Sequence, residues 1–345
     1  MQDTPRSTQA LLALVGQGVT GPALDVGSHD GAVAVRVGCT YANVDLVACQ
    51  RADQAGAGTV LHTDLLPDGP FVTLFFDARE YDPGFAAETV AQAAARLAPG
   101  GVFITTARLM DVQACFASVE EHGEALIARA PVPSPPSPEW PTYEVTVGEH
   151  THRVQSAPGV FSPRQLDLGT ALMLEQIGTP PPGARFLDLG CGAGIVSRIA
   201  AEAWGCRATA VDVNARALRL TALNAPAAEV VASNGFAALA GRQFDLIASN
   251  PPYHTDFGVA KAFIEGAHVH LELGGSLYLV VKRADWYVQK VRTTFGGCRV
   301  VEQNGYTVIV AEKRPPRPKA AQAAEPPTTR KHAKRMAGAS HKKRR

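Results

Sequence analysis

The chain has 345 residues, about twice the length of a typical domain, so we expect two domains. Its charge is nearly balanced, at 33 Lys and Arg against 32 Asp and Glu, and no apolar run is long enough to span a membrane. The six cysteines form no CxxC pair, and residues 1–7 lack the basic and apolar regions of a secretory signal. The composition therefore predicts a cytoplasmic protein with reduced thiols, bound to neither a membrane nor a metal ion.

The first predicted domain covers residues 1–130 and contains short β-rich runs. It is followed by residues 131–141, a Pro-rich segment that can form neither a helix nor an inner strand. We interpret this segment as a semi-rigid linker. It separates the first domain from a second one over residues 142–312.

The second predicted domain alternates strand-like runs with helical patterns, which is typical of an α/β fold with a parallel sheet. The strands are expected at residues 185–189, 208–213, 229–232, 244–249, 276–281, 298–302 and 306–311. Ser162 is expected to cap a helix that starts at Pro163 and completes a capping box with Gln165. The pair Asn304-Gly305 predicts a hairpin between the last two strands.

The last segment, residues 313–345, is strongly basic. It holds 12 Lys and Arg against one acid, Glu325, which leaves 21 basic and 31 acidic residues for the rest of the chain. Because the segment is rich in Pro, Ala and Lys with almost nothing to bury, we expect a disordered basic tail on an acidic body.

The first strand of the second domain runs into a glycine-rich turn, Asp-Leu-Gly-Cys-Gly-Ala-Gly, over residues 188–194. Such a turn lets backbone amides approach a nucleotide-like cofactor, although dinucleotide dehydrogenases use similar turns. Asp212 ends the next strand, where it could accept both hydroxyls of a ribose or cap a helix, as Asn214 also could. Asn234 is expected near an adenine ring, and Phe236 either borders that ring or packs in the core.

The turn Asn250-Pro251-Pro252-Tyr253 is much more specific. An exocyclic amine on a flat ring is a poor nucleophile because its lone pair is delocalised. If the Asn250 amide oxygen and the Pro251 carbonyl each accept one N–H, the lone pair is aimed at a methyl group, and the prolines stiffen both acceptors. Tyr253 offers a stacking face for a flipped base, and His254 either lines the pocket or lies in a solvated loop. These residues predict methyl transfer from S-adenosylmethionine to a planar exocyclic nitrogen.

The first domain repeats the plan of the second. Residues 23–27 parallel residues 186–190, and residues 99–104 parallel residues 273–278. Residues 72–77 stand where the second domain carries its Asn-Pro-Pro-Tyr strand, but the alternating glycines and the Asn-Pro-Pro turn are missing. We interpret the first domain as a duplicate that decayed into a support or RNA-docking domain. The alternative is a chance likeness of two α/β domains.

These motifs resemble the bacterial ribosomal RNA guanine-N(2) methyltransferases, above all the small-subunit enzymes. The resemblance rests on residues 158–170, 188–194, 233–234 and 249–254, and it is specific over about 156–312 and weak over 1–130. It implies two tandem Rossmann-like class I methyltransferase domains, the N-terminal one degenerate and the C-terminal one catalytic. It also implies methyl transfer from S-adenosylmethionine to the 2-amino group of a guanine in 16S ribosomal RNA, within the small subunit or its precursor.

The same resemblance assigns roles to residues. Asn250, Pro251 and Tyr253 are expected to hold the target base. The expected cofactor-binding residues are Asp188, Gly190, Gly192, Gly194, Asp212, Asn234 and Asn250. Phe161 and Thr170 are expected to close the methionine side. Tyr253 departs from the phenylalanine common in that family, and the basic tail is a second departure.

Three rival functions use parts of this pattern. An adenine-N(6) nucleic-acid methyltransferase shares the turn, but a DNA enzyme of that kind would carry a target-recognition domain unlike residues 1–130. A release-factor glutamine methyltransferase also shares it, but usually with a helical N-terminal domain. A non-catalytic RNA-binding protein is disfavoured because the motifs of the second domain are intact.

Overall fold

The computed structural model describes residues 4–15, 19, 21–135, 140–147, 150–252 and 257–315. Residues 136–139 of the expected linker and most of the expected tail lie outside the described residues. Two α/β units make up the described chain, and we call them the N-terminal half, residues 4–135, and the C-terminal half, residues 140–315.

The N-terminal half alternates helices and strands until a final β-hairpin. Its elements are α1 (Arg6–Leu14), β1 (Ala23–Val26), the 3-10 turn η2 (His29–Gly31), α2 (Ala32–Val37), β2 (Thr40–Asn43), α3 (Leu46–Gln54), β3 (Thr59–His62), β4 (Phe71–Phe76), α4 (Pro83–Arg96), β5 (Leu97–Thr105), α5 (Leu109–Cys115), β6 (Phe116–His122) and β7 (Ala125–Pro131).

The C-terminal half opens with a separate hairpin and then follows the same alternation. Its elements are β8 (Thr142–Val147), β9 (His150–Gln155), α6 (Leu168–Ile177), β10 (Arg185–Leu189), α7 (Ile195–Arg198), the π-helical turn η3 (Ile199–Ala203), β11 (Arg207–Asp212), α8 (Ala215–Asn224), β12 (Glu229–Ala232), β13 (Phe244–Ser249), α9 (Phe257–His270), β14 (Leu271–Val281), α10 (Ala284–Phe295), β15 (Arg299–Gln303) and β16 (Tyr306–Glu312).

Each half contains one seven-stranded sheet, and the two sheets have the same topology. The strand orders are β3-β2-β1-β4-β5-β7-β6 and β12-β11-β10-β13-β14-β16-β15. In both, parallel strands are followed by an antiparallel hairpin at one edge, and the second hairpin turns at Asn304-Gly305 as expected. The predicted fold of two tandem Rossmann-like domains is confirmed.

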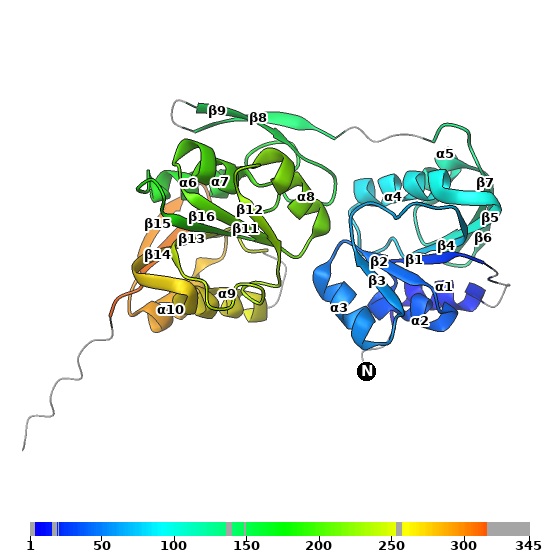
Figure 1. Ribbon diagram of the computed structural model, residues 1–345, viewed down its shortest axis with the longest axis horizontal. Coiled ribbons are helices and arrows are strands. Elements are labelled where there is room, and N and C mark those ends of the chain that lie inside the picture. Colours follow the sequence, from blue (N-terminus) through cyan, green and yellow to red (C-terminus); the bar gives the residue numbers. More distant parts are fainter. Residues whose placement is uncertain are drawn as a thin grey trace, which may run out of the picture. The chain divides into compact units, whose positions relative to one another are not determined.

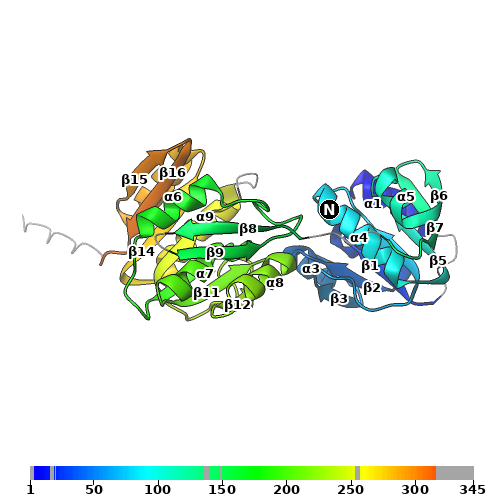
Figure 2. The ribbon, with the colours of Figure 1, turned by 90° about the horizontal axis from the view of Figure 1, so that it is seen from above.

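Helices cover both faces of each sheet (Figures 1 and 2). In the C-terminal half, α6, α7 and α8 pack on one face around Phe186, Leu172 and Leu220. On the other face, α9 and α10 contribute Ile264 and Val291 to a second core. Strands that are buried on both sides in this way read as continuous apolar runs. Within the described residues, no helix has both the length and the apolarity that crossing a membrane requires.

The strand registers show which residues of the two halves are equivalent. Val26 of β1 lies beside Ala42, and Leu189 of β10 lies beside Val211, so Asn43 stands at the place of Asp212. Val26 also lies beside Phe76, and Asp188 beside Ala248. By the same count, Asp77 stands at the place of Asn250. The residues expected to bind the cofactor and the base are therefore replaced in the N-terminal half, while the backbone plan is kept.

The helix expected after Ser162 begins later, so that prediction is wrong. Helix α6 starts at Leu168, and Asp167 caps it by accepting a hydrogen bond from the Thr170 N–H at 3.0 Å. Ser162 has a φ of +52°, and its hydroxyl donates to the Gln165 carbonyl at 2.8 Å, closing a turn. A carboxylate cap beside the N-terminus of a helix is favoured over the hydroxyl because it also meets the positive end of the helix dipole.

Equivalent turns of the two halves pair with each other. The Leu46 N–H donates to the Val213 carbonyl at 2.8 Å, and the Ala215 N–H donates to the Val44 carbonyl at 2.7 Å. Each turn follows the second strand of its sheet, β2 in one half and β11 in the other. Asp45 and Asn214, which form the bridge between them, cap the helices α3 and α8.

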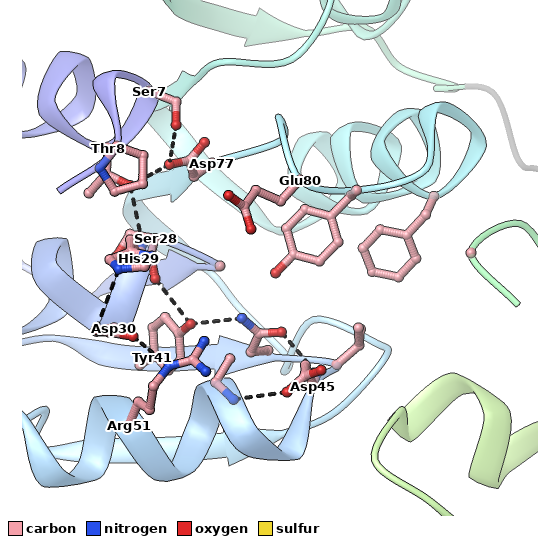
Figure 3. Close-up of a pocket in the computed structure, with 18 of the residues that line it drawn as sticks. Ser7, Thr8, Ser28, His29, Asp30, Tyr41, Asp45, Arg51, Asp77 and Glu80 are labelled. Carbon is pink, nitrogen blue, oxygen red and sulfur yellow. Dashed lines mark hydrogen bonds and ion pairs between the residues drawn. The ribbon is translucent and has the colours of Figure 1, made fainter. Parts of the chain in front are cut away.

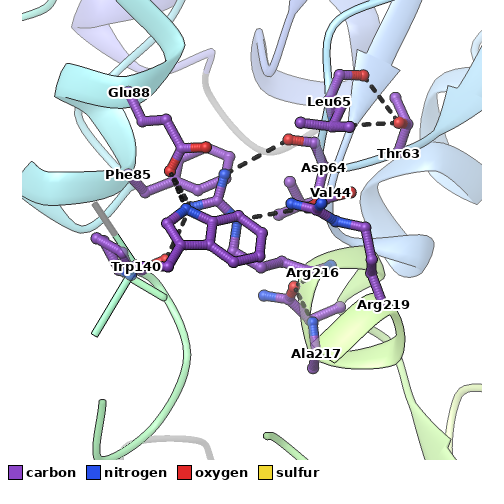
Figure 4. A network of polar contacts seen from close by, with 12 residues as sticks. Val44, Thr63, Asp64, Leu65, Phe85, Glu88, Trp140, Arg216, Ala217 and Arg219 are labelled. Carbon is purple, nitrogen blue, oxygen red and sulfur yellow. Dashed lines mark hydrogen bonds and ion pairs between the residues drawn. The ribbon is translucent and has the colours of Figure 1, made fainter. Parts of the chain in front are cut away.

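A buried charge network lies beside these turns (Figure 4). Arg216 of α8 is fully buried and donates to the Glu88 carboxylate of α4 at 2.8 Å and to the Pro158 carbonyl at 3.0 Å. Arg219 donates to the Asp64 carboxylate at 2.8 Å. Because a buried charge is tolerated only with well-placed partners, this network ties α8 firmly to α4.

Candidate active site

The candidate site lies at the carboxyl ends of β10, β11 and β13, which are neighbours in the C-terminal sheet. This edge is where ligands bind in open parallel α/β sheets. Ser249, the last residue of β13, donates its hydroxyl to the Leu189 carbonyl at the end of β10 at 2.7 Å. The Asn-Pro-Pro turn and the glycine turn therefore start from strand ends that are bonded to each other.

The glycine turn needs glycine for two reasons. At Gly194, a Cβ atom would lie 2.7 Å from the Thr221 Cα, so only glycine lets α7 approach α8 this closely. At Gly190, the φ is +80° and a Cβ would meet no described atom within 4 Å, so that side of the turn is open to a ligand within the described structure. Gly192 donates its N–H to the Asp212 carboxylate at 3.0 Å.

Asp212 follows this turn at the end of β11 and is half-buried. Its carboxylate also accepts the Asn214 N–H at 2.9 Å, and Asn214 caps α8. The expected alternatives are thereby separated, since Asn214 is the helix cap and Asp212 closes the turn. Burial raises the pKa of Asp212. Each carboxylate oxygen keeps a lone pair beyond these backbone bonds, which is what a ribose diol would require.

Asp188 is almost completely buried and is bonded to the first turn of α7. It accepts the Ser197 hydroxyl at 2.6 Å and the Ser197 N–H at 3.0 Å. Burial raises the pKa of Asp188 to about 6, although these two hydrogen bonds act to lower it. The structure thus gives Asp188 a structural partner, and its expected contact with the cofactor stays a prediction.

Asn250 lies directly after β13, with Pro251 buried behind it. The Asn250 side-chain nitrogen Nδ2 donates to the Asp167 Oδ2 at 3.1 Å and to the Thr170 Oγ1 at 2.9 Å. This arrangement directs the amide oxygen away from α6. Tyr253 and His254 lie outside the described residues, so their expected roles stay predictions.

Three other residues from the sequence analysis have clear positions. Asn234 is exposed just after β12, at the same edge of the sheet as Asp212. Phe236 stacks on His270 at a centroid distance of 4.7 Å and packs against Gly266, so the core interpretation of Phe236 is the correct one. Phe161 is 56% exposed. Thr170 is buried and bonded to Asn250, as given above.

Sequence reasoning missed Asp167 and Tyr306. The Tyr306 hydroxyl donates to the Asp167 Oδ1 at 2.7 Å, and this bond raises the pKa of Tyr306 to about 12. Asp167 could have been found as a cap, because it stands before an apolar helical run and three residues before Thr170. No local pattern marks Tyr306, whose partner lies 139 positions away in the sequence.

Cys191 lies inside the glycine turn and is buried. Its sulfur accepts the Thr221 hydroxyl at 3.2 Å, and burial raises the pKa of the thiol well above its usual range. The thiol therefore packs between α7 and α8 and carries no thiolate for nucleophilic attack. Among the residues that the structure describes, no three His, Cys, Asp or Glu side chains are placed to hold a metal ion.

The equivalent edge of the N-terminal sheet holds a cavity of about 320 Å³ (Figure 3). His29 stands there at the place of Gly192. The Tyr81 hydroxyl lies 2.3 Å from where a Gly27 Cβ would be, so its ring covers the turn. Asp77 accepts hydroxyl groups of Ser7 at 3.0 Å and of Thr8 (Figure 3). These substitutions support the expectation that the N-terminal half is degenerate.

Comparison with known proteins supports the resemblance stated above. Residues 151–310 match the family described as Methyltransferase small domain. A ribosomal RNA small subunit methyltransferase C from Erwinia tasmaniensis is 40% identical over 171 residues, which are 47% of this chain and 49% of the relative. The enzyme of the same name from Yersinia pseudotuberculosis is 37% identical over 191 residues, 52% of this chain and 53% of the relative. The chain thus spans about half the length of the curated relatives it matches.

A solved structure extends the likeness in fold to both halves. The Thermus thermophilus 16S rRNA N2 G1207 methyltransferase, determined with S-adenosylmethionine and guanosine, superposes with a TM-score of 0.74 at 21% identity. The superposition covers 88% of this chain and 91% of that chain. At this identity the match shows the fold, and the fold includes the duplicated plan of two sheets.

Proposed function

We propose that the chain is a methyltransferase that moves a methyl group from S-adenosylmethionine to the 2-amino group of a guanine in 16S ribosomal RNA. The observation that carries the proposal is the Asn250 amide, held by Asp167 and Thr170 beside the open glycine turn. The names of the relatives supply the substrate, and the two-sheet fold agrees with the Thermus enzyme. Such an enzyme works in the cytoplasm, on the small subunit or its precursor.

The residues at this edge fit S-adenosylmethionine. The open side of Gly190 admits a ligand close to the backbone, and the Asp212 carboxylate suits the ribose hydroxyls. Asn234, exposed at the end of β12, suits the adenine. Gly192 and Gly194 shape the turn, and Asp188 holds it against α7. When bound, S-adenosylmethionine supplies an electrophilic methyl carbon whose bond to sulfur breaks as a nitrogen lone pair attacks it.

The protein's part is to make the amine nucleophilic. The Asn250 amide oxygen and the Pro251 carbonyl accept the two N–H groups of the 2-amino nitrogen, which draws its lone pair out of conjugation with the ring. Pro251 and Pro252 fix the backbone, so the acceptors need no reorganisation during the reaction. One N–H proton is lost to water after transfer. Tyr253 stacks on the flipped guanine, a contribution of about 1–3 kcal/mol.

The N-terminal half bears on the rival functions. It contains a seven-stranded sheet, unlike the helical domain expected of a release-factor glutamine methyltransferase. It also repeats the catalytic plan, unlike a separate DNA target-recognition domain. Its role in the proposed enzyme is support, through the turn at Val44 and the network of Arg216, or RNA docking.

Mass mapping of ribosomal RNA from a strain lacking this chain tests the proposal. One N(2)-methylguanosine should be absent from 16S RNA and should return when the purified chain and S-adenosylmethionine are added to small subunits. A missing N(6)-methyladenosine, or an unmethylated release-factor glutamine with intact RNA, would establish a rival function instead.

A further inference from the structure

The Asn250 amide is one member of a hydrogen-bonded chain that joins three separate segments. The Nδ2 atom donates both protons, one to the Asp167 Oδ2 and one to the Thr170 Oγ1. The other carboxylate oxygen of Asp167 accepts the Tyr306 hydroxyl at 2.7 Å. The carboxyl end of β13, the start of α6 and the start of β16 therefore meet at a single carboxylate.

This chain decides which way the amide faces. A side-chain amide has a donor end and an acceptor end, and the hydrogen-bond network determines their assignment. With the amide rotated by half a turn, the Asn250 oxygen would face the Asp167 carboxylate, and two acceptors would meet without a proton between them. An unmade bond of this kind to a half-buried charged group costs about 1–3 kcal/mol or more. The orientation with the oxygen away from α6 is strongly preferred.

We propose that Asp167 and Tyr306 are positioning residues that hold the Asn250 amide with its oxygen turned toward the target amine. The inference rests on the proposed function. Asp167 fixes the donor end of the amide, and Tyr306 fixes Asp167. The Tyr306 ring packs so closely on α6 that a Cβ at Gly169 would lie 2.3 Å from the ring, so the phenol has little freedom to move.

The N-terminal half provides an internal comparison. Pro5 precedes α1 where Asp167 precedes α6, so the carboxylate is missing there. Asp77 replaces Asn250 and accepts from Ser7 and from the Thr106 hydroxyl, each at 3.0 Å. A carboxylate only accepts and has no donor end to orient. The Asp and Asn pair occurs in the half that keeps the Asn-Pro-Pro turn, as a device for orienting an amide requires.

Two variants of the full-length protein test the inference. Asp167→Asn keeps the volume and the helix cap, since Asn also caps well, but its own NH₂ group can face Asn250 and release the preferred orientation. Tyr306→Phe removes only the bond to Asp167. Tyr278→Phe, on the neighbouring strand β14, is the matched control, because Tyr278 packs against apolar residues.

Kinetics on the RNA substrate give the first measurement. We expect kcat to fall about tenfold for Tyr306→Phe and more for Asp167→Asn, below the 10²–10³ of losing the direct contact. The KM for RNA, cofactor affinity and melting temperature should stay near the wild-type values, as in Tyr278→Phe. Unchanged kcat in both variants would overturn the inference. A loss of kcat that merely follows a loss of melting temperature or cofactor affinity would also overturn it.

The second measurement needs no RNA. The side-chain NH₂ protons of Asn250, identified by ¹⁵N labelling of asparagine and by their absence in Asn250→Ala, should exchange slowly with solvent in the wild type. They should exchange faster in Asp167→Asn, and equal rates would overturn the inference. If the wild-type protein methylates no guanine, the proposed function fails, while this exchange rate still tests how the amide is held.

Discussion

Asp188 and Asp212 are carboxylates beside the same glycine turn, but their roles differ. Asp188 accepts the N–H of Ser197 nine residues on, and Asp25 of the N-terminal half accepts the N–H of Ala34 at the same spacing. The N-terminal half lacks the other site residues but keeps this bond, so the bond fastens a turn to a helix. Asp212 is replaced by Asn43 there. The charge of Asp212 is the one that follows the cofactor chemistry.

We expect Asp212→Ala to weaken S-adenosylmethionine binding, because two ribose hydroxyls lose a charged acceptor and each such bond is worth about 1.5–3 kcal/mol. Titration calorimetry measures the change. Asp212→Asn is the control for the turn, because its amide oxygen can still accept the N–H of Gly192 or Asn214. Unchanged affinity in Asp212→Ala would show that the carboxylate serves only to close the turn.

Asn250→Ala is expected to lower the rate of methyl transfer by at least about 10²–10³ while cofactor affinity stays nearly unchanged. The reason is that the amide contacts the target amine, and its other bonds go to Asp167 and Thr170 rather than to the cofactor turn. Turnover and cofactor binding are measured on the same preparation. Wild-type turnover would rule out the amide mechanism.

A pH effect on stability should come from Asp25. Burial raises its pKa from 3.8 to about 7 in the folded chain, whereas the unfolded carboxyl ionises near its ordinary value. Between these pH values the folded chain binds a proton that the unfolded chain has released, so the free energy of unfolding falls as pH rises. Urea unfolding at several pH values should show this fall for the wild type and for the exposed control Asp68→Asn, but a flatter curve for Asp25→Asn. Parallel curves for all three proteins would contradict it.

Strands are the elements that the sequence predicts best. The runs at 185–189, 229–232 and 244–249 match β10, β12 and β13 at both ends. These strands lie inside a sheet that is covered on both faces, so their apolar character is continuous and ends abruptly at turns. Strand β14 starts at Leu271, five residues before the predicted 276, because the chain stays paired across an irregularity in register near Phe244.

The contacts between elements are much less predictable. The glycine turn and the Asn-Pro-Pro turn mark the site because each has a local signature. The Asp167 bond to Tyr306 and the Arg216 bond to Glu88 join positions 139 and 128 residues apart. No periodicity or local motif encodes such pairs, since they depend on how complete elements pack.

The packing of α8 on α4 can be tested at Glu88. Glu88→Ala should lower the free energy of unfolding by about 3–5 kcal/mol, because it leaves the fully buried Arg216 without its closest carboxylate. Denaturant unfolding measures this change. Glu265→Ala removes an exposed ion pair with Lys290 and should change stability by less than about 1 kcal/mol. Equal effects of the two variants would show that the buried network is not stabilising.

At the scale of the whole molecule, the basic segment begins far from the candidate site. Strand β16 starts at Tyr306, beside Asp167, and runs to Glu312, which pairs with Ser276 near the opposite edge of the sheet. Lys313 continues that pairing by exchanging backbone hydrogen bonds with Gly274 and Gly275, each 2.8 Å long. The segment therefore starts roughly 20 Å from the catalytic edge, given the rise per residue of a strand.

Truncation after Lys313 should consequently affect RNA binding but not the chemical step. We expect a higher KM for RNA and a flatter salt dependence, by up to ~0.7 log units per lost phosphate contact on single strands. The kcat at saturating RNA should barely change. A solubilising extension without a role in binding would instead leave KM and the salt slope at the full-length values.

The paired turns around Val44 and Val213 have a consequence for the history of the chain. Each turn gives one N–H to its counterpart and receives one in return, which is the self-complementary exchange of an isologous contact between identical subunits. A single-domain ancestor that used this turn would form a homodimer with two equal sites. Once fusion made the association intramolecular, one copy could lose its catalytic residues while the shared contact was retained. The degenerate half persists as the fused partner of an ancestral dimer.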